Sequence, residues 1–119
     1  MIAYLLVFLG GGIGSICRFF LTKAVPPTWA FPYATLLANL LSCFILGSLI
    51  GLRMRGAIPQ NAQFLMVSGF CGGFSTFSTF SMELLQMFEE GQLTKGMAYL
   101  GISLLSGLLF LIVGIRLLQ

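Results

Sequence analysis

The sequence predicts an all-α membrane protein, built as a single integral-membrane domain of residues 1–119 with four transmembrane helices. Apolar residues make up 58% of the chain and charged residues only 8%, whereas a soluble domain carries about a quarter charged residues. Mean hydropathy is +1.03. Four apolar segments, each close to the roughly 20 residues that a helix needs to cross a bilayer, cover most of the sequence.

The first two predicted spans are continuous apolar helices. Residues 2–21 have no basic segment ahead of the apolar run, so we expect a retained span and not a cleaved signal peptide. Residues 33–52, YATLLANLLSCFILGSLIGL, form the second span. The connection between them, residues 23–32, contains prolines that interrupt a helix.

The third and fourth spans are predicted at residues 62–88 and 97–117. The third contains GFCGGFSTFSTFS, the most polar and least helix-favouring stretch of the chain. The connections at residues 53–61 and 89–96 contain glycine, proline or charged residues that end helices. Since every connection is short, none is expected to fold as a separate domain.

The few charged and metal-binding side chains exclude several functions. The basic residues are scattered near the ends of the apolar runs, where they anchor spans at the interface, so no nucleic-acid partner is expected. The chain has no histidine and no CxxC pair, which argues against a zinc site. The three cysteines lie in apolar stretches and are interpreted as small buried residues.

The basic residues do not orient the chain in the membrane. With four spans, both termini and the second connection share one side, so three basic residues face three others: Arg53, Arg55 and Arg116 against Arg18, Lys23 and Lys95. An equal count is what a chain inserted in both directions would show, and dual topology is therefore a hypothesis. Small residues recur at four-residue spacing in every span, which predicts close helix contacts. Four helices alone leave little interior for a pathway, so we expect a dimer.

Two polar side chains lie within the predicted spans. Asn39 is in the middle of the second span, one turn after Thr35 on the same face. An amide at that depth forms an interhelical hydrogen bond or lines a pathway. Glu83 is the only acid deep within a span, and it is either part of a pathway or an anchor at the interface. Both alternatives stay open for each residue.

The stretch GFCGGFSTFSTFS predicts a helix break followed by two stripes of side chains. Gly69, Gly72 and Gly73 weaken a helix, and the hydroxyl side chains compete for its backbone groups. Carbonyl groups freed within a membrane must face protein, water or an ion, and they suit a hard cation such as sodium. If the helix resumes, Phe77 and Phe80 share a face beside hydroxyls that recur at the same interval. The alternative is a kinked helix that only packs.

The stripes favour a small, hard anion as the species conducted. They contain no ring of acids that would favour cations, and no central lysine or arginine that would trap an anion. Hydroxyl groups, the Asn39 amide and the positive edges of phenyl rings are donors that an anion can use while it sheds water. The residues alone do not identify the anion.

The sequence resembles the Fluc (CrcB-type) fluoride channels over essentially its whole length. The specific motif is GFCGGFSTFSTFS, which resembles the third-helix signature of that family. Two weaker segments agree with it, GGGIGSICRF at residues 10–19 and ATLLANLLSCFILG at residues 34–47.

The resemblance implies four-helix subunits with a broken third helix, assembled as an antiparallel, dual-topology homodimer in the cell membrane. It implies two fluoride pathways that passively export fluoride and limit its toxicity, with no enzyme activity. It also implies a central sodium ion that is structural and not transported, held by the backbone carbonyls of Gly72 and Ser75 from both subunits. The implied fluoride pathway consists of Asn39, Phe77, Phe80, Ser78, Thr79 and Glu83, with Tyr99 and Ser103 on the fourth helix, and Arg18 matches a first-helix arginine with a structural or vestibule role.

Two positions depart from the family pattern. Ser75 stands where threonine is usual, a change that matters little if the ligand is the backbone carbonyl. Gly107 stands where some members have a further hydroxyl, and the neighbouring Ser106 is expected to face elsewhere.

Two other function classes remain as alternatives. Small proton-coupled multidrug exporters also have four spans and dual topology, but by resemblance they rely on a glutamate in the first span, which this chain lacks. A non-transporting structural subunit would not need the phenylalanine and hydroxyl stripes.

Overall fold

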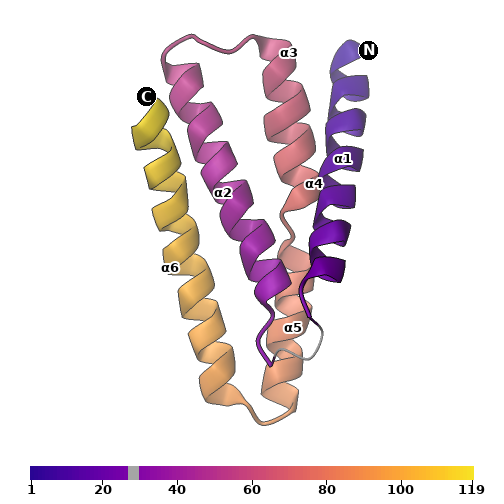
Figure 1. The fold of residues 1–119 in the computed structure, drawn as a ribbon, viewed down its shortest axis with the longest axis vertical. Helices are drawn as coiled ribbons and strands as arrows, with labels where there is room; N and C mark the ends of the chain where they lie inside the picture. Colours follow the sequence, from indigo (N-terminus) through magenta and orange to yellow (C-terminus); the bar gives the residue numbers. More distant parts are fainter. Residues whose placement is uncertain (27–29) are drawn as a thin grey trace.

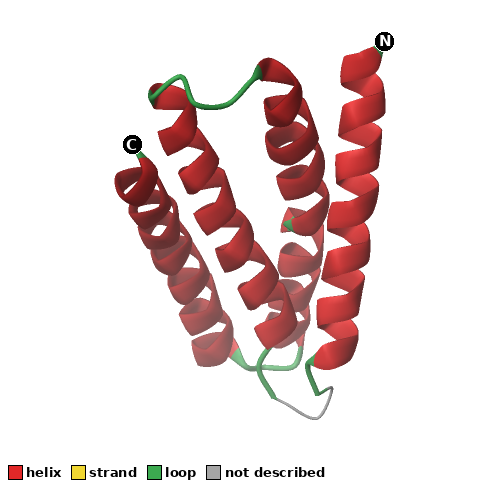
Figure 2. Ribbon diagram, turned by 45° about the horizontal axis from the view of Figure 1, so that its top comes forward, coloured by secondary structure: helices red, strands yellow, loops and turns green. Residues whose placement is uncertain are grey.

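A computed structural model describes residues 1–26 and 30–119, and within these residues it contains helices and no strands (Figures 1 and 2). The predicted first connection, residues 23–32, includes residues 27–29, which lie outside the described part. Seven helical elements follow one another along the chain: α1 (Ile2–Ala24), α2 (Tyr33–Met54), α3 (Gln60–Gln63), the π-helical segment η1 (Phe64–Cys71), α4 (Gly72–Phe74), α5 (Phe77–Glu89) and α6 (Leu93–Leu118).

The prediction of an all-α membrane protein is confirmed for the described residues. Three helices, α1, α2 and α6, are long and apolar enough to cross a membrane, judged by length and composition. The third predicted span, residues 62–88, is divided among α3, η1, α4 and α5, the longest of which has 13 residues. The molecule is 48 Å long, close to the thickness of a bilayer with its headgroups, about 40–45 Å.

The helices run side by side and connect at alternating ends of the bundle. Both termini and the connection from α2 to α3 lie at one end, while α5 and α6 join at the other (Figure 1). In consequence α2 and α6 run in the same direction and pack along each other, and α1 packs against η1 and α4. The third helix therefore packs mainly against α1 and less extensively against α2.

Glycines make the close helix contacts possible, as their four-residue spacing predicts. A Cβ atom at Gly10 or Gly14 in α1 would collide with backbone carbonyl oxygens of η1. A Cβ atom at Gly47 would collide with the carbonyl oxygen of Leu111 in α6. Because the neighbouring atoms are backbone and cannot rotate away, only glycine permits these helix spacings.

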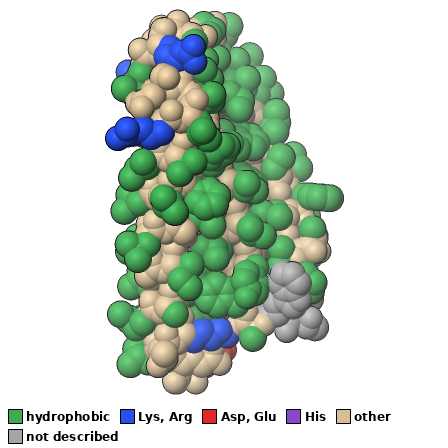
Figure 3. All heavy atoms as spheres, turned by 60° about the vertical axis from the view of Figure 1, so that its left-hand side comes forward, with side chains coloured by type: hydrophobic (Ala, Val, Ile, Leu, Met, Phe, Trp, Pro, Cys, Tyr) green, Lys and Arg blue, Asp and Glu red, His purple; other side chains and the backbone are tan. Residues whose placement is uncertain are grey.

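The exterior is apolar and the charges lie towards the ends. On the face drawn in Figure 3, lysine and arginine side chains appear near both ends of the long axis, and the surface between them is mainly hydrophobic. The small core consists of Leu36, Phe80, Met87 and Tyr99. Of the cysteines, Cys71 is buried and Cys43 half-buried, but Cys17 is exposed on α1, so the prediction that all three are buried was wrong for Cys17. A lipid-facing surface accepts a small apolar residue as readily as a core does.

The α1 contact yields the first prediction. Gly14→Ala places a methyl group against the Phe70 carbonyl oxygen and 2.9 Å from the Phe74 nitrogen, so we expect a loss of about 1–3 kcal/mol of stability from overpacking. The measurement is the midpoint of thermal unfolding of purified protein in detergent, followed by circular dichroism.

Gly12→Ala is the matched control, because a Cβ atom at Gly12 has no neighbour within 4 Å. This variant should unfold at or above the wild-type midpoint, since alanine is the better helix former. Equal midpoints for Gly14→Ala and Gly12→Ala would contradict the close contact.

Candidate functional site

The third helix is interrupted at two residues, Ser75 and Thr76. Ser75 has φ −77° and ψ 158°, and Thr76 has φ −151° and ψ 115°, so both are extended. Gly72, one of the glycines expected to weaken the helix, is itself helical, with φ −63° and ψ −35°. The extended residues therefore follow the glycines and do not coincide with them. Thr76 then caps α5, because its Oγ1 accepts a hydrogen bond from the Thr79 N–H at 3.2 Å.

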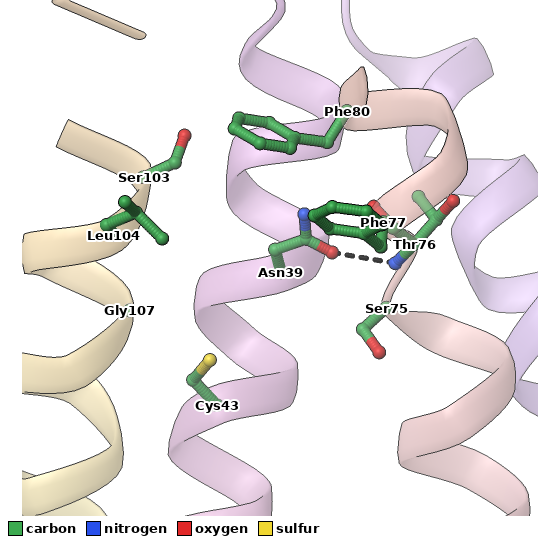
Figure 4. A pocket seen from close by; sticks show the side chains of 9 residues that line it. All are labelled: Asn39, Cys43, Ser75, Thr76, Phe77, Phe80, Ser103, Leu104 and Gly107. Atoms are coloured by element: carbon green, nitrogen blue, oxygen red, sulfur yellow. Dashed lines mark hydrogen bonds between the residues drawn. The ribbon is translucent and has the colours of Figure 1, made fainter. Parts of the chain in front are cut away.

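Asn39 of α2 supplies the hydrogen bonds that the interruption removes. The Thr76 N–H donates to Asn39 Oδ1 at 2.8 Å, and Asn39 Nδ2 donates to the Thr76 carbonyl oxygen at 3.3 Å. The first of these bonds is drawn in Figure 4. In an uninterrupted helix the Thr76 N–H would bond to the carbonyl of Gly72. The amide of Asn39 thus replaces a backbone partner, and the predicted interhelical hydrogen bond is confirmed. Asn39 also lines a cavity.

Several carbonyl groups beside the interruption are left without a donor, and those of Gly72 and Ser75 are among them. Among the described residues, no hydrogen bond ends on the carbonyl oxygen of Gly72 or Ser75. The Ser75 hydroxyl turns away and donates to the Cys71 carbonyl oxygen at 2.8 Å. A Cβ atom at Gly72 would meet nothing within 4 Å, so the backbone there is open. Free carbonyl oxygens in an open position fit a hard cation such as sodium.

Arg18 and Ser15 of α1 bind the carbonyl between those two. Arg18 Nε donates to the Gly73 carbonyl oxygen at 3.2 Å, and Ser15 Oγ lies 3.5 Å from the same atom. Arg18 therefore ties α1 to the last turn before the interruption. This contact supports a structural role for Arg18 more directly than a place in an aqueous vestibule.

A cavity of about 250 Å³ opens where α2, the interruption and α6 meet. Phe80 is buried with 7% of its surface exposed, while Phe77 is 80% exposed. Their ring centroids are 6.1 Å apart, as their three-residue spacing predicts. Figure 4 shows the side chains that line the cavity: Asn39, Cys43, Ser75, Thr76, Phe77, Phe80, Ser103, Leu104 and Gly107.

The Ser103 hydroxyl is the feature of this cavity that points to an occupant. Its oxygen is buried and has no hydrogen-bond partner among the described residues. A buried hydroxyl without a partner is costly, about 1–3 kcal/mol, so this group is available to a water molecule or an ion that enters the cavity. By contrast, the Ser106 hydroxyl donates to the Ile102 carbonyl of its own helix and is satisfied.

Glu83 forms a second polar centre, one turn beyond Phe80 towards the α5–α6 end. Thr35 Oγ1 donates to Glu83 Oε1 at 2.6 Å, and Tyr99 Oη donates to Oε2 at 2.7 Å. Tyr99 is fully buried, with its ring 4.9 Å from that of Phe80 and 5.2 Å from that of Phe31. A carboxylate bound by two buried hydroxyls is not a simple interface anchor.

Glu83 also lines an open hollow of about 380 Å³ at the α5–α6 end, whose polar residues are Glu83, Gln86, Glu90, Gln92 and Lys95. Phe80 lines the first cavity, its ring lies 4.9 Å from that of Tyr99, and Tyr99 binds Glu83, so a chain of side-chain contacts runs from the first cavity to the second hollow.

The predicted residues Ser78 and Thr79 are not brought into either cavity. Thr76 Oγ1 donates to Thr79 Oγ1 at 3.1 Å, and Ser78 Oγ lies 3.4 Å from the same Thr76 hydroxyl. Both residues therefore gather around the cap of α5. The predicted site residues Asn39, Phe77, Phe80 and Ser103 meet at the first cavity, and Glu83 and Tyr99 meet beyond it.

Sequence reasoning left Thr76 and Thr35 out of the predicted site. Thr76 accepts or donates most of the hydrogen bonds at the interruption, and Thr35 binds Glu83. Thr76 could have been predicted as an N-cap, because it is a threonine at the point where the helix is expected to restart, three residues before Thr79. The signal for Thr35 was its position one turn before Asn39.

Comparison with known proteins finds one family along almost the whole chain. The family model described as CrcB-like protein, Camphor Resistance (CrcB) matches residues 5–115. A protein of Phocaeicola vulgatus named fluoride-specific ion channel FluC is 38% identical over 97% of this chain and 97% of its own. Proteins of the same name are 39% identical in Thermus thermophilus, over 96% of this chain and 91% of theirs, and 43% identical in Pyrococcus furiosus, over 73% and 72%.

The cap at the interruption yields the second prediction. Thr76→Val keeps the shape of the side chain and removes the acceptor for the Thr79 N–H, so stability should fall by about 1 kcal/mol. The measurement is again the thermal midpoint in detergent. Thr76→Ser keeps the acceptor and should restore most of the loss.

Thr22→Val is the control, because the Thr22 hydroxyl is exposed and bonds only to the Arg18 carbonyl of its own helix. A midpoint for Thr76→Val no lower than that for Thr22→Val would show that the cap contributes nothing.

Proposed function

The chain belongs to the CrcB family, whose relatives described above are named fluoride-specific ion channels, and from this premise we propose that it conducts fluoride. A channel of this family is not an enzyme. We propose further that the protein lies in the cell membrane and lets fluoride leave the cytoplasm passively, which limits fluoride toxicity.

The cavity beside the interruption carries the proposal. It gathers the Asn39 amide, the Ser103 hydroxyl that lacks a partner, and the rings of Phe77 and Phe80. These groups offer N–H, O–H and positive ring edges to an anion. Its lining includes no lysine or arginine, so a dehydrated anion would be stabilised without being held tightly. Fluoride, small and strongly hydrogen-bonding, suits such a lining.

The second half of the path would run from Phe80 to the hollow at the α5–α6 end. Tyr99 and Thr35 both donate to Glu83. When the Glu83 side chain moves aside, these two hydroxyls become available to a passing fluoride. The ion would then enter the hollow lined by Gln86 and Gln92, which opens to water.

The free carbonyls of Gly72 and Ser75 would hold a structural sodium ion. Bound sodium supplies a fixed positive charge that compensates the exposed carbonyl dipoles. Two carbonyls are too few for a sodium ion, so a second copy would add the same pair. This requirement supports the homodimer, and the equal distribution of basic residues supports its antiparallel, dual-topology form.

No observation favours the multidrug exporter. The first helix, α1, contains no aspartate or glutamate, and the one acid deep in the bundle, Glu83, is bound by Thr35 and Tyr99.

The third prediction tests the function directly. Liposomes that hold the purified protein should release fluoride down its gradient, measured with a fluoride electrode, and should retain chloride and a cationic dye. Absence of fluoride efflux would overturn the proposal, and efflux of the dye would favour an exporter.

The fourth prediction places the path at the cavity. Phe80→Ile removes the ring from the lining, and Asn39→Asp puts a negative charge beside the permeating anion, so each should lower fluoride efflux by at least about tenfold, which corresponds to 1.4 kcal/mol. The dimer must persist on size-exclusion chromatography. Ser106→Ala is the matched control, because that hydroxyl bonds to its own helix. Efflux at the wild-type rate in both variants would place the path elsewhere.

The fifth prediction concerns sodium. Prolonged dialysis of the protein against a large cation such as N-methylglucamine should slowly abolish efflux, and added sodium should restore it. Full activity in sodium-free protein would exclude the structural ion without affecting the assignment of fluoride.

A further inference from the structure

A third cavity, at the opposite end of the bundle from Glu83, belongs to neither half of the fluoride path. It measures about 150 Å³ and lies between the last turns of α2, the connection that follows, α3 and η1. Its lining is apolar except for three side chains, Arg53, Gln63 and Ser68, and the remaining residues are Leu49, Ile50, Ile58, Phe64 and Val67. The cavity therefore combines an apolar wall with one cation and two hydrogen-bonding groups.

The charge of this end is positive without compensation from acidic side chains. Arg53 and Arg55 lie at the end of α2, and Arg116 is in the last turn of α6, which ends beside α2. All three acidic side chains of the chain, Glu83, Glu89 and Glu90, belong to α5 or directly follow it, at the other end. Within the described residues Arg53 makes no ion pair. A guanidinium group that lines a cavity without a carboxylate partner is available to an anion from outside the chain.

We propose that this cavity binds the phosphate headgroup of an anionic phospholipid, with phosphatidylglycerol as the test ligand. The Arg53 guanidinium would pair with the phosphate in a bidentate manner, and Gln63 and Ser68 would donate to its remaining oxygens. The start of the acyl chains would lie along the apolar wall. Basic pockets between transmembrane helices bind anionic headgroups in this way.

The apolar wall and the neighbouring charges select among phosphate ligands. Inorganic phosphate would use Arg53 but would gain nothing from Leu49, Ile50 or Phe64. A zwitterionic lipid would bring an ammonium group close to the Arg53 guanidinium, which is unfavourable. An anionic phospholipid can pair its phosphate with Arg53 and place its acyl chains against the apolar residues of the lining.

Native mass spectrometry of the purified full-length protein tests the proposal. Delipidated protein is incubated with phosphatidylglycerol, phosphatidylcholine or inorganic phosphate at equal concentrations, and the bound fraction per chain is measured. We expect phosphatidylglycerol to bind at one copy per chain and phosphatidylcholine to bind at least about fivefold less. Arg53→Gln should weaken phosphatidylglycerol binding about tenfold, the loss expected for a charged hydrogen bond.

Two further variants separate the cavity from general surface charge. Gln63→Glu keeps the size of the side chain and places a carboxylate in the cavity lined by Arg53, so it should weaken phosphatidylglycerol binding at least as much as Arg53→Gln does. Arg116→Gln removes a cation from the same end but not from the cavity lining, and its binding should equal the wild type. The proposal is overturned if phosphatidylcholine or phosphate binds as well as phosphatidylglycerol, or if Arg116→Gln weakens binding as much as Arg53→Gln. None of these readouts depends on fluoride.

Discussion

The pairing of Asn39 with the backbone of Thr76 is the interaction on which the rest of this structure depends. Two extended residues within a membrane-depth helix leave backbone groups that lipid cannot satisfy. Asn39 offers one acceptor and one donor and binds both the N–H and the carbonyl of Thr76. With the main chain fixed there, the Thr76 hydroxyl can cap α5, and the helix restarts in a direction that places Phe80 against Tyr99. The cavity, the cap and the Glu83 centre all follow from one side-chain amide.

Glycines set two of the close helix spacings in the bundle. Gly47 and Gly114 let α2 and α6 approach until their backbones touch, and Gly10 and Gly14 do the same for α1 and η1. The third helix is thus fixed to α1 by close backbone contacts, and Arg18 adds a hydrogen bond to the Gly73 carbonyl. A side chain as short as asparagine bridges two helices only when the helices are fixed at such distances.

The sequence predicted the long helices well and the interruption only approximately. The expected spans at residues 2–21, 33–52 and 97–117 lie within Ile2–Ala24, Tyr33–Met54 and Leu93–Leu118, because length and hydropathy are local properties. The extended pair was not predictable from the glycines, because Gly72 is helical. The extended conformation at Thr76 is stabilised by Asn39, which lies 37 residues away in the sequence. The sequence could not predict that Cys17 is exposed either, because an apolar surface that faces lipid and an apolar core have the same composition.

The position of the interruption is consistent with the proposed antiparallel homodimer. Residues 60–74 precede it and Phe77–Glu89 follow it, so the extended pair lies near the middle of the third span. An antiparallel pair is related by a two-fold axis in the membrane plane, and only residues near the middle of the membrane stay at the same depth in both copies. Such an axis would bring the open backbone at Gly72 of one copy next to that of the other. Phe77, with 80% of its surface exposed beside those carbonyls, would be covered by the same contact. A parallel pair would also place two Gly72 sites together, but it requires every copy to insert in the same orientation, and the equal distribution of basic residues gives the chain no bias towards one orientation.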